Sequence, residues 1–116
     1  MTAVGHKGLI VWQKAMDLVV LVYRLTQAFP SSELYGLTSQ MRRSAVSIPS
    51  NIAEGRKRGS EVEFRRFLFI AFGSGAELET QLEIGQRLGF CDATLFSLAT
   101  DLLNEVMRML NKMTSE

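Results

Sequence analysis

The chain has 116 residues, of which 47% are hydrophobic and 22% are charged, and its formal net charge is +1. This balance is typical of one folded globular domain and excludes an intrinsically disordered chain. The single cysteine, Cys91, cannot form an internal disulfide, so we expect a cytoplasmic protein. The longest apolar runs, 18–23 and 67–76, are far shorter than the roughly 20 residues that span a membrane, so we expect neither a signal peptide nor a membrane helix.

The charge is unevenly distributed along the chain. Residues 42–66 hold seven Arg and Lys against three Glu, a net charge of +4. Residues 77–105 hold six acidic residues against Arg87 alone, a net charge of −5. A basic region beside an acidic one favours either a polyanionic partner or complementary contacts between subunits.

The first helical pattern predicts a helix over residues 8–29. The residues that share one face at a 3.6-residue period are Trp12, Ala15, Met16, Val19, Val22, Tyr23 and Thr26. Leu18, Leu21 and Leu25 lie on the opposite side. Pro30 ends this helix because the residue before a proline is displaced from the helical region, and Ser31 or Ser32 can then cap the next helix.

Residues 32–57 predict a second helix whose apolar stripe keeps its phase across Pro49. The stripe consists of Leu34, Leu37, Met41, Ala45, Ile48, Ile52 and Gly55. A genuine break would have no reason to preserve that phase. We therefore interpret the segment as one helix kinked at Pro49, which removes the hydrogen bond to the Ala45 carbonyl. Two helices separated at Ile48 are the alternative.

Two further helices are predicted over residues 60–88 and 92–113. Ser60 and Glu63 form a capping box at the start of the first, and Gly89 is suited to end it. Its stripe consists of Phe64, Phe67, Leu68, Ala71, Gly75, Leu78 and Leu82. Asp92 is expected to cap the last helix, whose stripe consists of Leu95, Leu98, Leu102, Val106, Met109 and Met113. Four helices with short links predict an all-α protein, an up-down-up-down antiparallel four-helix bundle in one domain over residues 1–116.

Apolar residues outside the predicted core stripes favour an oligomer. We predict an interface made of Leu18, Leu21, Leu25, Phe69, Ile70 and Phe72. A helix that is apolar nearly all round is usually buried on more than one side, and soluble monomers avoid large exposed apolar patches. Gly73, Gly75 and Gly85 favour close approach by a neighbouring helix, within or between chains. The alternative is a few tolerated apolar residues on the surface.

Polar residues form a second line beside the apolar stripe of the 32–57 helix. They are Gln40, Ser47, Asn51, Glu54 and Arg58. Polar groups at the edge of a core must be hydrogen-bonded, so we interpret these residues as a structural network that sets the register between helices or subunits. A ligand or nucleic-acid contact is the alternative.

No catalytic constellation is evident, and we predict a protein that is not an enzyme. The single histidine, His6, has no partner that would complete a di-metal helical site, so no metal or cofactor is expected. Cys91 has no histidine near it in sequence, which argues against a cysteine nucleophile. A solvated helix face is the commoner explanation of the acidic cluster Glu77, Glu79 and Glu83.

The strongest functional indication is a set of basic residues around the turn between the second and third helices. We predict a nucleic-acid-binding surface made of Arg42, Arg43, Arg56, Lys57, Arg58, Arg65 and Arg66. Such patches bind phosphate backbones without reading the base sequence. An ordinary solvated surface is the alternative.

Several motifs occur in an order that resembles a known bacterial family. They are Leu9-Ile10-Val11-Trp12-Gln13-Lys14-Ala15, Tyr23, Phe29-Pro30, Tyr35-Gly36-Leu37-Thr38-Ser39-Gln40, Arg42-Arg43, Ser47-Ile48-Pro49-Ser50-Asn51-Ile52-Ala53-Glu54-Gly55, Gly73-Ser74 and Ala76-Glu77-Leu78-Glu79-Thr80-Gln81-Leu82. The chain resembles the 23S rRNA intervening-sequence protein family over about residues 9–90. The fourth helix carries no motif.

The resemblance implies a left-handed up-and-down four-helix bundle that assembles as a homopentamer. It implies no catalytic residues. A related group, the accessory proteins of diversity-generating retroelements, uses a similar basic pentamer to engage a reverse transcriptase and nucleic acid. We therefore expect a homo-oligomer that binds RNA or DNA in the setting of rRNA. The alternative is an oligomeric protein-interaction scaffold or accessory subunit without nucleic-acid binding.

Overall fold

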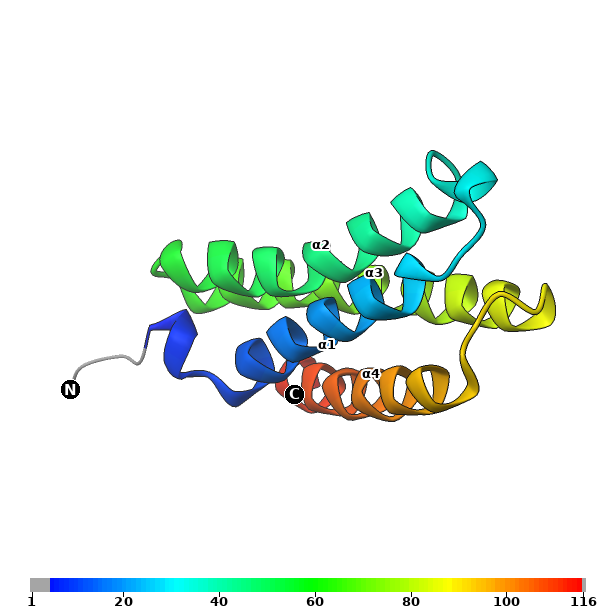
Figure 1. Cartoon of the computed structure of the whole chain (residues 1–116). Coiled ribbons are helices and arrows are strands. Elements are labelled where there is room, and N and C mark those ends of the chain that lie inside the picture. The colour runs from blue at the N-terminus through cyan, green and yellow to red at the C-terminus, as the bar shows by residue number, and fades with distance from the viewer. Residues whose placement is uncertain (1–4, 116) are drawn as a thin grey trace.

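Four α-helices account for most of the computed structural model, which describes residues 5–115. They are α1 (Ile10–Gln27), α2 (Leu37–Lys57), α3 (Glu61–Arg87) and α4 (Ala93–Thr114), and short 3-10 helices η1 (His6–Gly8) and η2 (Ser31–Glu33) precede α1 and α2. The helices lie side by side along the molecule, whose extents are 49 × 24 × 22 Å (Figure 1). Residues 5–115 contain no strand, so the all-α prediction is confirmed.

The helices form a closed ring around one core. α1 packs against α2 and α4, and α3 also packs against α2 and α4. α2 and α3 run in opposite directions, because Ser47 meets Ser74 whereas Gly55, further along α2, lies against Phe67, earlier on α3. Each helix therefore buries one face toward the centre and leaves the other outside.

The core-facing sides of α2 and α3 are those predicted from the sequence. On α2 the buried residues include Met41, Ala45, Ile48 and Ile52, and on α3 the predicted residues from Phe67 to Leu82 are buried. Leu34 is an exception, because the chain before Leu37 is not part of α2 and leaves this side chain 47% exposed.

The predicted faces of α1 and α4 are corrected by the structure. α1 buries Val11, Ala15, Leu18, Val22, Leu25 and Thr26. Met16 and Tyr23, which were assigned to its core stripe, are exposed. α4 buries Ala99, Leu103, Val106, Leu110 and Thr114, whereas Leu98 and Met113 are exposed. Apolar residues surround most of α1, and on α4 they cover about half of the circumference, a wider strip than the one that is buried, so periodicity alone did not select the buried face.

The start of α2 also differs from the prediction. Ser31 and Ser32 do not cap it, because they belong to η2 and the helix begins at Leu37. Glu33 supplies the capping interaction instead, since its Oε1 accepts a hydrogen bond from the backbone amide of Leu37 at 3.1 Å. This contact holds the 34–36 segment against the helix end.

α2 continues through Pro49 without interruption, so the alternative of two helices is excluded. Pro49 is buried inside the helix, and Figure 1 shows the axis of α2 bending between its two halves. A bend is expected where proline removes an intrahelical hydrogen bond.

The predicted caps at the starts of α3 and α4, and the predicted glycines after α2 and α3, are confirmed. The hydroxyl of Ser60 accepts from the amide of Glu63 at 3.3 Å, and the carboxylate of Asp92 accepts from the amide of Leu95 at 2.9 Å. Gly59 and Gly89 follow α2 and α3 with φ of 76°, a left-handed conformation that glycine adopts without strain.

Candidate nucleic-acid interface

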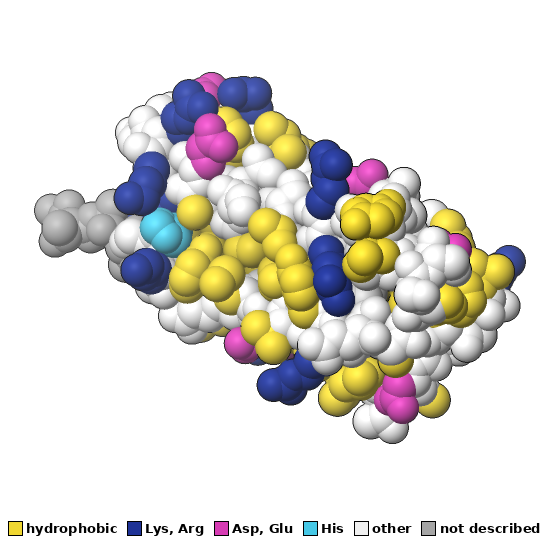
Figure 2. Space-filling model, turned by 45° about the horizontal axis from the view of Figure 1, so that its top comes forward, with side chains coloured by type: hydrophobic (Ala, Val, Ile, Leu, Met, Phe, Trp, Pro, Cys, Tyr) yellow, Lys and Arg dark blue, Asp and Glu magenta, His cyan; other side chains and the backbone are white. Residues whose placement is uncertain are grey.

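Five of the seven predicted basic residues meet at one end of the bundle. Arg56 and Lys57 end α2, Arg58 follows them, and Arg65 and Arg66 lie in the first two turns of α3. Figure 2 shows Lys and Arg side chains around the histidine at this end of the molecule. We call these five residues together with Lys7 the basic end.

The guanidinium groups of the basic end lie over phenylalanine rings. Arg58 and Arg66 are 4.9 and 4.8 Å from the centroid of the Phe67 ring. Arg56 is 5.3 Å from Phe64, and Arg65 is 5.8 Å from Phe69. Such cation–π contacts restrict long side chains that would otherwise sample many rotamers, so the charges of the basic end are held in place.

Part of this positive charge is compensated locally. Arg58 donates to the carboxylate of Glu54 at 2.8 Å, and Arg66 donates to Glu63 at 3.4 Å. Both pairs are exposed and lie along one helix, so water screens them and they add little stability. Lys57 and Arg65 have no carboxylate within ion-pair distance among residues 5–115.

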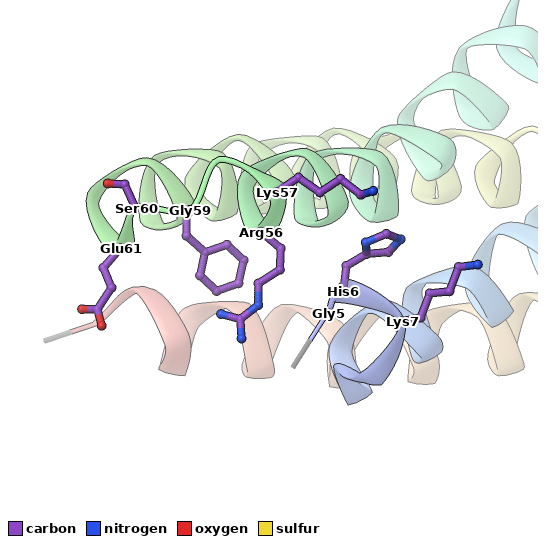
Figure 3. A pocket seen from close by; sticks show the side chains of 9 residues that line it. Gly5, His6, Lys7, Arg56, Lys57, Gly59, Ser60 and Glu61 are labelled. Carbon is purple, nitrogen blue, oxygen red and sulfur yellow. The ribbon is translucent and has the colours of Figure 1, made fainter. Parts of the chain in front are cut away.

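Sequence reasoning missed a contribution from η1. Lys7 and His6 line a pocket of about 640 Å³ together with Arg56, Lys57 and Phe64, and Figure 3 shows η1 and the end of α2 on its two sides. Gln13 Nε2 donates to the Lys7 carbonyl at 2.9 Å, and the His6 ring packs edge-on against Trp12 at 5.2 Å. No local pattern indicates this contact, because it joins segments about 50 residues apart in the chain.

Arg42 and Arg43 do not join the basic end. They precede Arg56 by fourteen and thirteen positions on α2, a separation of about 20 Å at 1.5 Å per residue. Arg42 Nε donates to Thr26 Oγ1 at 2.9 Å, and its guanidinium lies 4.5 Å from the Tyr23 ring centroid. The predicted set therefore divides into two separate surfaces.

Charge differs between the two halves of the bundle. The half that contains the basic end (5–18, 48–74 and 104–115) holds nine Lys and Arg against five Asp and Glu. The other half (19–47 and 75–103) holds four against six. The electrostatic potential is thus more positive at one end of the molecule, which favours approach of a polyanion from that side.

The predicted polar line divides into two groups. Ser47 Oγ lies 2.9 Å from Ser74 Oγ on α3, and Asn51 Nδ2 donates to both the carbonyl and the hydroxyl of Ser47. Glu54 and Arg58 form the exposed ion pair described above. Gln40 is exposed and lines one groove together with Ser47 and Ser74. Ser47 and Asn51 link α2 to α3, whereas Glu54 and Arg58 belong to the basic end.

The residues predicted for an oligomer interface lie in different environments. Leu18 and Leu25 are completely buried in the core of this chain, so they cannot contact another copy. Leu21 and Phe72 are half-buried and pack against the core. Phe69 and Ile70 are 54% and 41% exposed. Of the predicted interface residues, only Phe69 and Ile70 on α3 face outward, whereas Leu18 and Leu25 on α1 fill the centre of the bundle.

No metal site is formed by the described residues, 5–115, since they contain no group of three His, Cys, Asp or Glu side chains able to hold a metal ion. In the same part of the chain no helix is long and apolar enough to cross a bilayer. Partial burial raises the pKa of the Cys91 thiol above its ordinary value, which disfavours the reactive thiolate.

The fold and the basic end together define an all-α, four-helix protein with a positively charged tip. A family model described as 23S rRNA-intervening sequence protein matches residues 7–112, and the chain belongs to that family. The crystal structure of a protein of unknown function from the S23 ribosomal protein family of Bacteroides thetaiotaomicron is similar, with a TM-score of 0.81 over 92% of this chain and 100% of that one. Its sequence identity is 22%, so this likeness shows the fold alone. No functionally curated protein matches the chain.

Proposed function

We propose that this protein is a non-enzymatic, homo-oligomeric nucleic-acid-binding protein that contacts the RNA backbone, in the setting of 23S rRNA intervening sequences. The observation that carries the proposal is the basic end, where Lys and Arg side chains from η1, α2 and α3 gather. Phosphate contacts by Lys and Arg release counterions and supply most of non-specific nucleic-acid affinity.

The contacts of these arginines support the proposal. Four guanidinium groups lie over phenylalanine rings, which limits the conformational freedom that binding would otherwise remove. Guanidinium groups also match phosphate geometry with paired donors. A preorganised set of cations at the positive end of the molecule suits a backbone that presents one phosphate after another.

The test replaces Arg56, Lys57 and Arg58 by glutamine and measures RNA binding by fluorescence anisotropy over a range of salt concentrations. We expect weaker binding to all RNA sequences alike, because phosphate contacts carry no base information. The slope of log K against log salt should fall by about 0.7–0.9 per lost contact. Gly59, Ser60 and Glu63 are unchanged, so the cap of α3 is preserved.

A control removes two positive charges from the other half of the bundle by replacing Arg24 and Arg87 with glutamine. Both side chains are exposed, and Arg87 pairs with its neighbour Glu83 on α3. RNA affinity and salt slope should stay close to those of the parent protein. Equal losses in the control and the triple variant would refute a localised site, as would a parent protein that binds no RNA.

We also propose that the chain forms a ring-shaped homo-oligomer, a pentamer, of up-down-up-down bundles. Exposed apolar side chains support this assembly: Phe69 and Ile70 on α3 face outward, and Val62 is 78% exposed. Val62 and Phe69 are seven positions apart and therefore share one face of α3, and exposed apolar patches are characteristic of protein–protein contacts. Static light scattering at micromolar concentration should return a multiple of the 13.0 kDa chain, and a monomer mass would refute it.

The same apolar surface supports the second candidate function, an oligomeric scaffold for another protein without nucleic-acid binding. The two candidates differ in salt dependence, because apolar contacts do not weaken with salt as phosphate contacts do. An oligomer that fails to retard RNA even at low salt would favour the scaffold.

A further inference from the structure

A groove between α2 and α3 is lined almost entirely by hydrogen-bonding side chains. It has a volume of about 540 Å³, and none of the residues of the basic end lines it. Ser44 and Ser47 come from α2, and Ser74 and Gln81 come from α3. Ser47 and Ser74 bond to each other and link the two helices, but this link does not explain the other polar residues of the groove.

One buried polar atom in this groove has no partner. Gln81 is 6% exposed, and its side-chain oxygen has no hydrogen bond among the described residues. An unpaired buried polar atom is costly and calls for a donor from elsewhere. The terminal torsion of a glutamine is soft, so this oxygen can turn toward a ligand in the groove that it lines.

The rim of the groove adds an aromatic ring and a cation. Tyr35 is 94% exposed, in a segment held by Glu33, whose side chain and carbonyl accept hydrogen bonds from Leu37 and Gly36. Arg43 lines the groove beside it and has no carboxylate within ion-pair distance among residues 5–115. The ring of Tyr35 is open to solvent on a backbone segment held by these hydrogen bonds, so a base can stack on it, and the Arg43 guanidinium can bind a phosphate.

This rim also borders a second groove, of about 590 Å³, on the side of α1. Tyr35 and Arg43 line both grooves, and Arg42 lines the second, where Thr26 and Tyr23 hold its guanidinium. Two arginines and two tyrosines therefore follow one another across the outer surface of α1 and α2. This is the pattern of a path for a chain of phosphates with interspersed bases.

We infer that the α2–α3 groove binds an unpaired nucleotide of RNA. The base stacks on Tyr35, its edge exchanges hydrogen bonds with Gln81 and the neighbouring serines, and Arg43 holds the adjoining phosphate. Glutamine amides pair with base edges, and single-stranded RNA is recognised by such stacking and edge contacts. Glu77 also lines the groove, and its carboxylate accepts hydrogen bonds from base or ribose donors. The same negative charge repels the phosphate, which therefore lies beside Arg43.

A nucleotide fits this groove better than a protein segment does. The centre of a protein–protein interface is depleted of Ser and Glu, whereas this groove presents four serines and Glu77. The inference rests on the proposed function, since both require that the protein binds RNA. It adds that the RNA has an unpaired segment and names the residues that contact it.

The test compares a fluorescein-labelled oligouridylate strand with an RNA duplex of equal phosphate count, using the parent protein, Tyr35→Ala and Tyr35→Phe. Because Tyr35 is almost fully exposed, neither substitution should alter the fold. Tyr35→Ala should weaken single-strand binding about 5- to 140-fold, the equivalent of about 1–3 kcal/mol of stacking per base. Duplex binding should be unchanged, and Tyr35→Phe should bind both probes as the parent does.

Gln81→Leu supplies an independent measurement. Leucine has a similar volume and removes the unpartnered oxygen, so the fold should be retained, as circular dichroism can check. We expect a selective loss of single-strand affinity here as well, because the base edge loses its partner.

Three results would overturn the inference. The first is an unchanged single-strand affinity in Tyr35→Ala, and the second is an equal loss for strand and duplex. The third is a fall in oligomer mass in Tyr35→Ala or Gln81→Leu, which would show that the groove is a contact between copies of the chain. If the parent binds both probes and only the Arg56, Lys57 and Arg58 substitutions weaken them, this inference fails while the proposed function stands. If the parent binds neither probe, the proposed function fails first.

Discussion

Replacing Gly55 by alanine tests the close contact between α2 and α3. A Cβ atom at Gly55 would lie 2.6 Å from the Cβ of Phe67 and 3.3 Å from the carbonyl oxygen of Phe64. Carbon atoms normally approach to about 3.5–4.0 Å. Phe67 cannot relieve the clash by changing rotamer, because its Cβ is attached directly to the backbone. The two helices would have to separate by about 1 Å.

The expected size of the effect combines two opposing contributions. Overpacking of this kind costs about 1–3 kcal/mol, and the backbone contacts at Gly55 place it in the upper part of that range. Alanine recovers at most about 1 kcal/mol of helix propensity relative to glycine. We therefore expect the free energy of unfolding to fall by about 1–2 kcal/mol.

Gly73→Ala is the matched control. Gly73 is also inside a helix, but an added Cβ meets nothing within 4 Å, so only the gain in helix propensity remains. This variant should be about 0.5–1 kcal/mol more stable than the parent. Urea unfolding followed by circular dichroism at one protein concentration measures both. If Gly55→Ala is as stable as Gly73→Ala, the close approach of α2 and α3 does not depend on the glycine and the reasoning is wrong.

Two further predictions concern Pro49 and Cys91. Pro49→Ala should leave the bundle folded and about 1 kcal/mol more stable, because the regained hydrogen bond to the Ala45 carbonyl outweighs the loss of two buried methylenes. A fall in helical content, measured by circular dichroism, would show instead that packing requires the bend at Pro49. Burial raises the pKa of the Cys91 thiol, so iodoacetamide should alkylate it more slowly in the native protein than in urea at mildly alkaline pH. The free energy of unfolding should likewise decrease as the pH rises toward that raised pKa, because the unfolded chain releases the proton first. Equal alkylation rates in the native and unfolded protein would contradict this.

The glycines show how far sequence reasoning extends. Glycine within a helix indicates close packing, and Gly75 and Gly85 fit this, since added Cβ atoms would meet Met107 and Phe29. Gly73 does not, because its surroundings in this chain are open. The tightest contact belongs to Gly55, which the sequence pattern marked only as one position of an apolar stripe.

The functional surfaces depended still more on the tertiary structure. The run Arg56-Lys57-Arg58 and the nearby Arg65 and Arg66 are close in sequence, so their meeting at one turn was predictable. Arg42 and Arg43 were grouped with them although the length of α2 keeps them apart. Lys7 joined the basic end, and Gln81 met Tyr35 at one groove, through contacts between segments far apart in the chain.

Sequence alone determined the number and order of the helices, the continuity of α2 through Pro49, and the caps at Ser60 and Asp92. These features depend on local rules, namely side-chain periodicity, proline geometry and hydrogen bonds within a few residues. The buried faces of α1 and α4, the Glu33 contact that starts α2 and the two separate arginine surfaces were decided by the fold. The physical reason is that periodicity shows which residues share a face, whereas burial depends on which other helices pack against it.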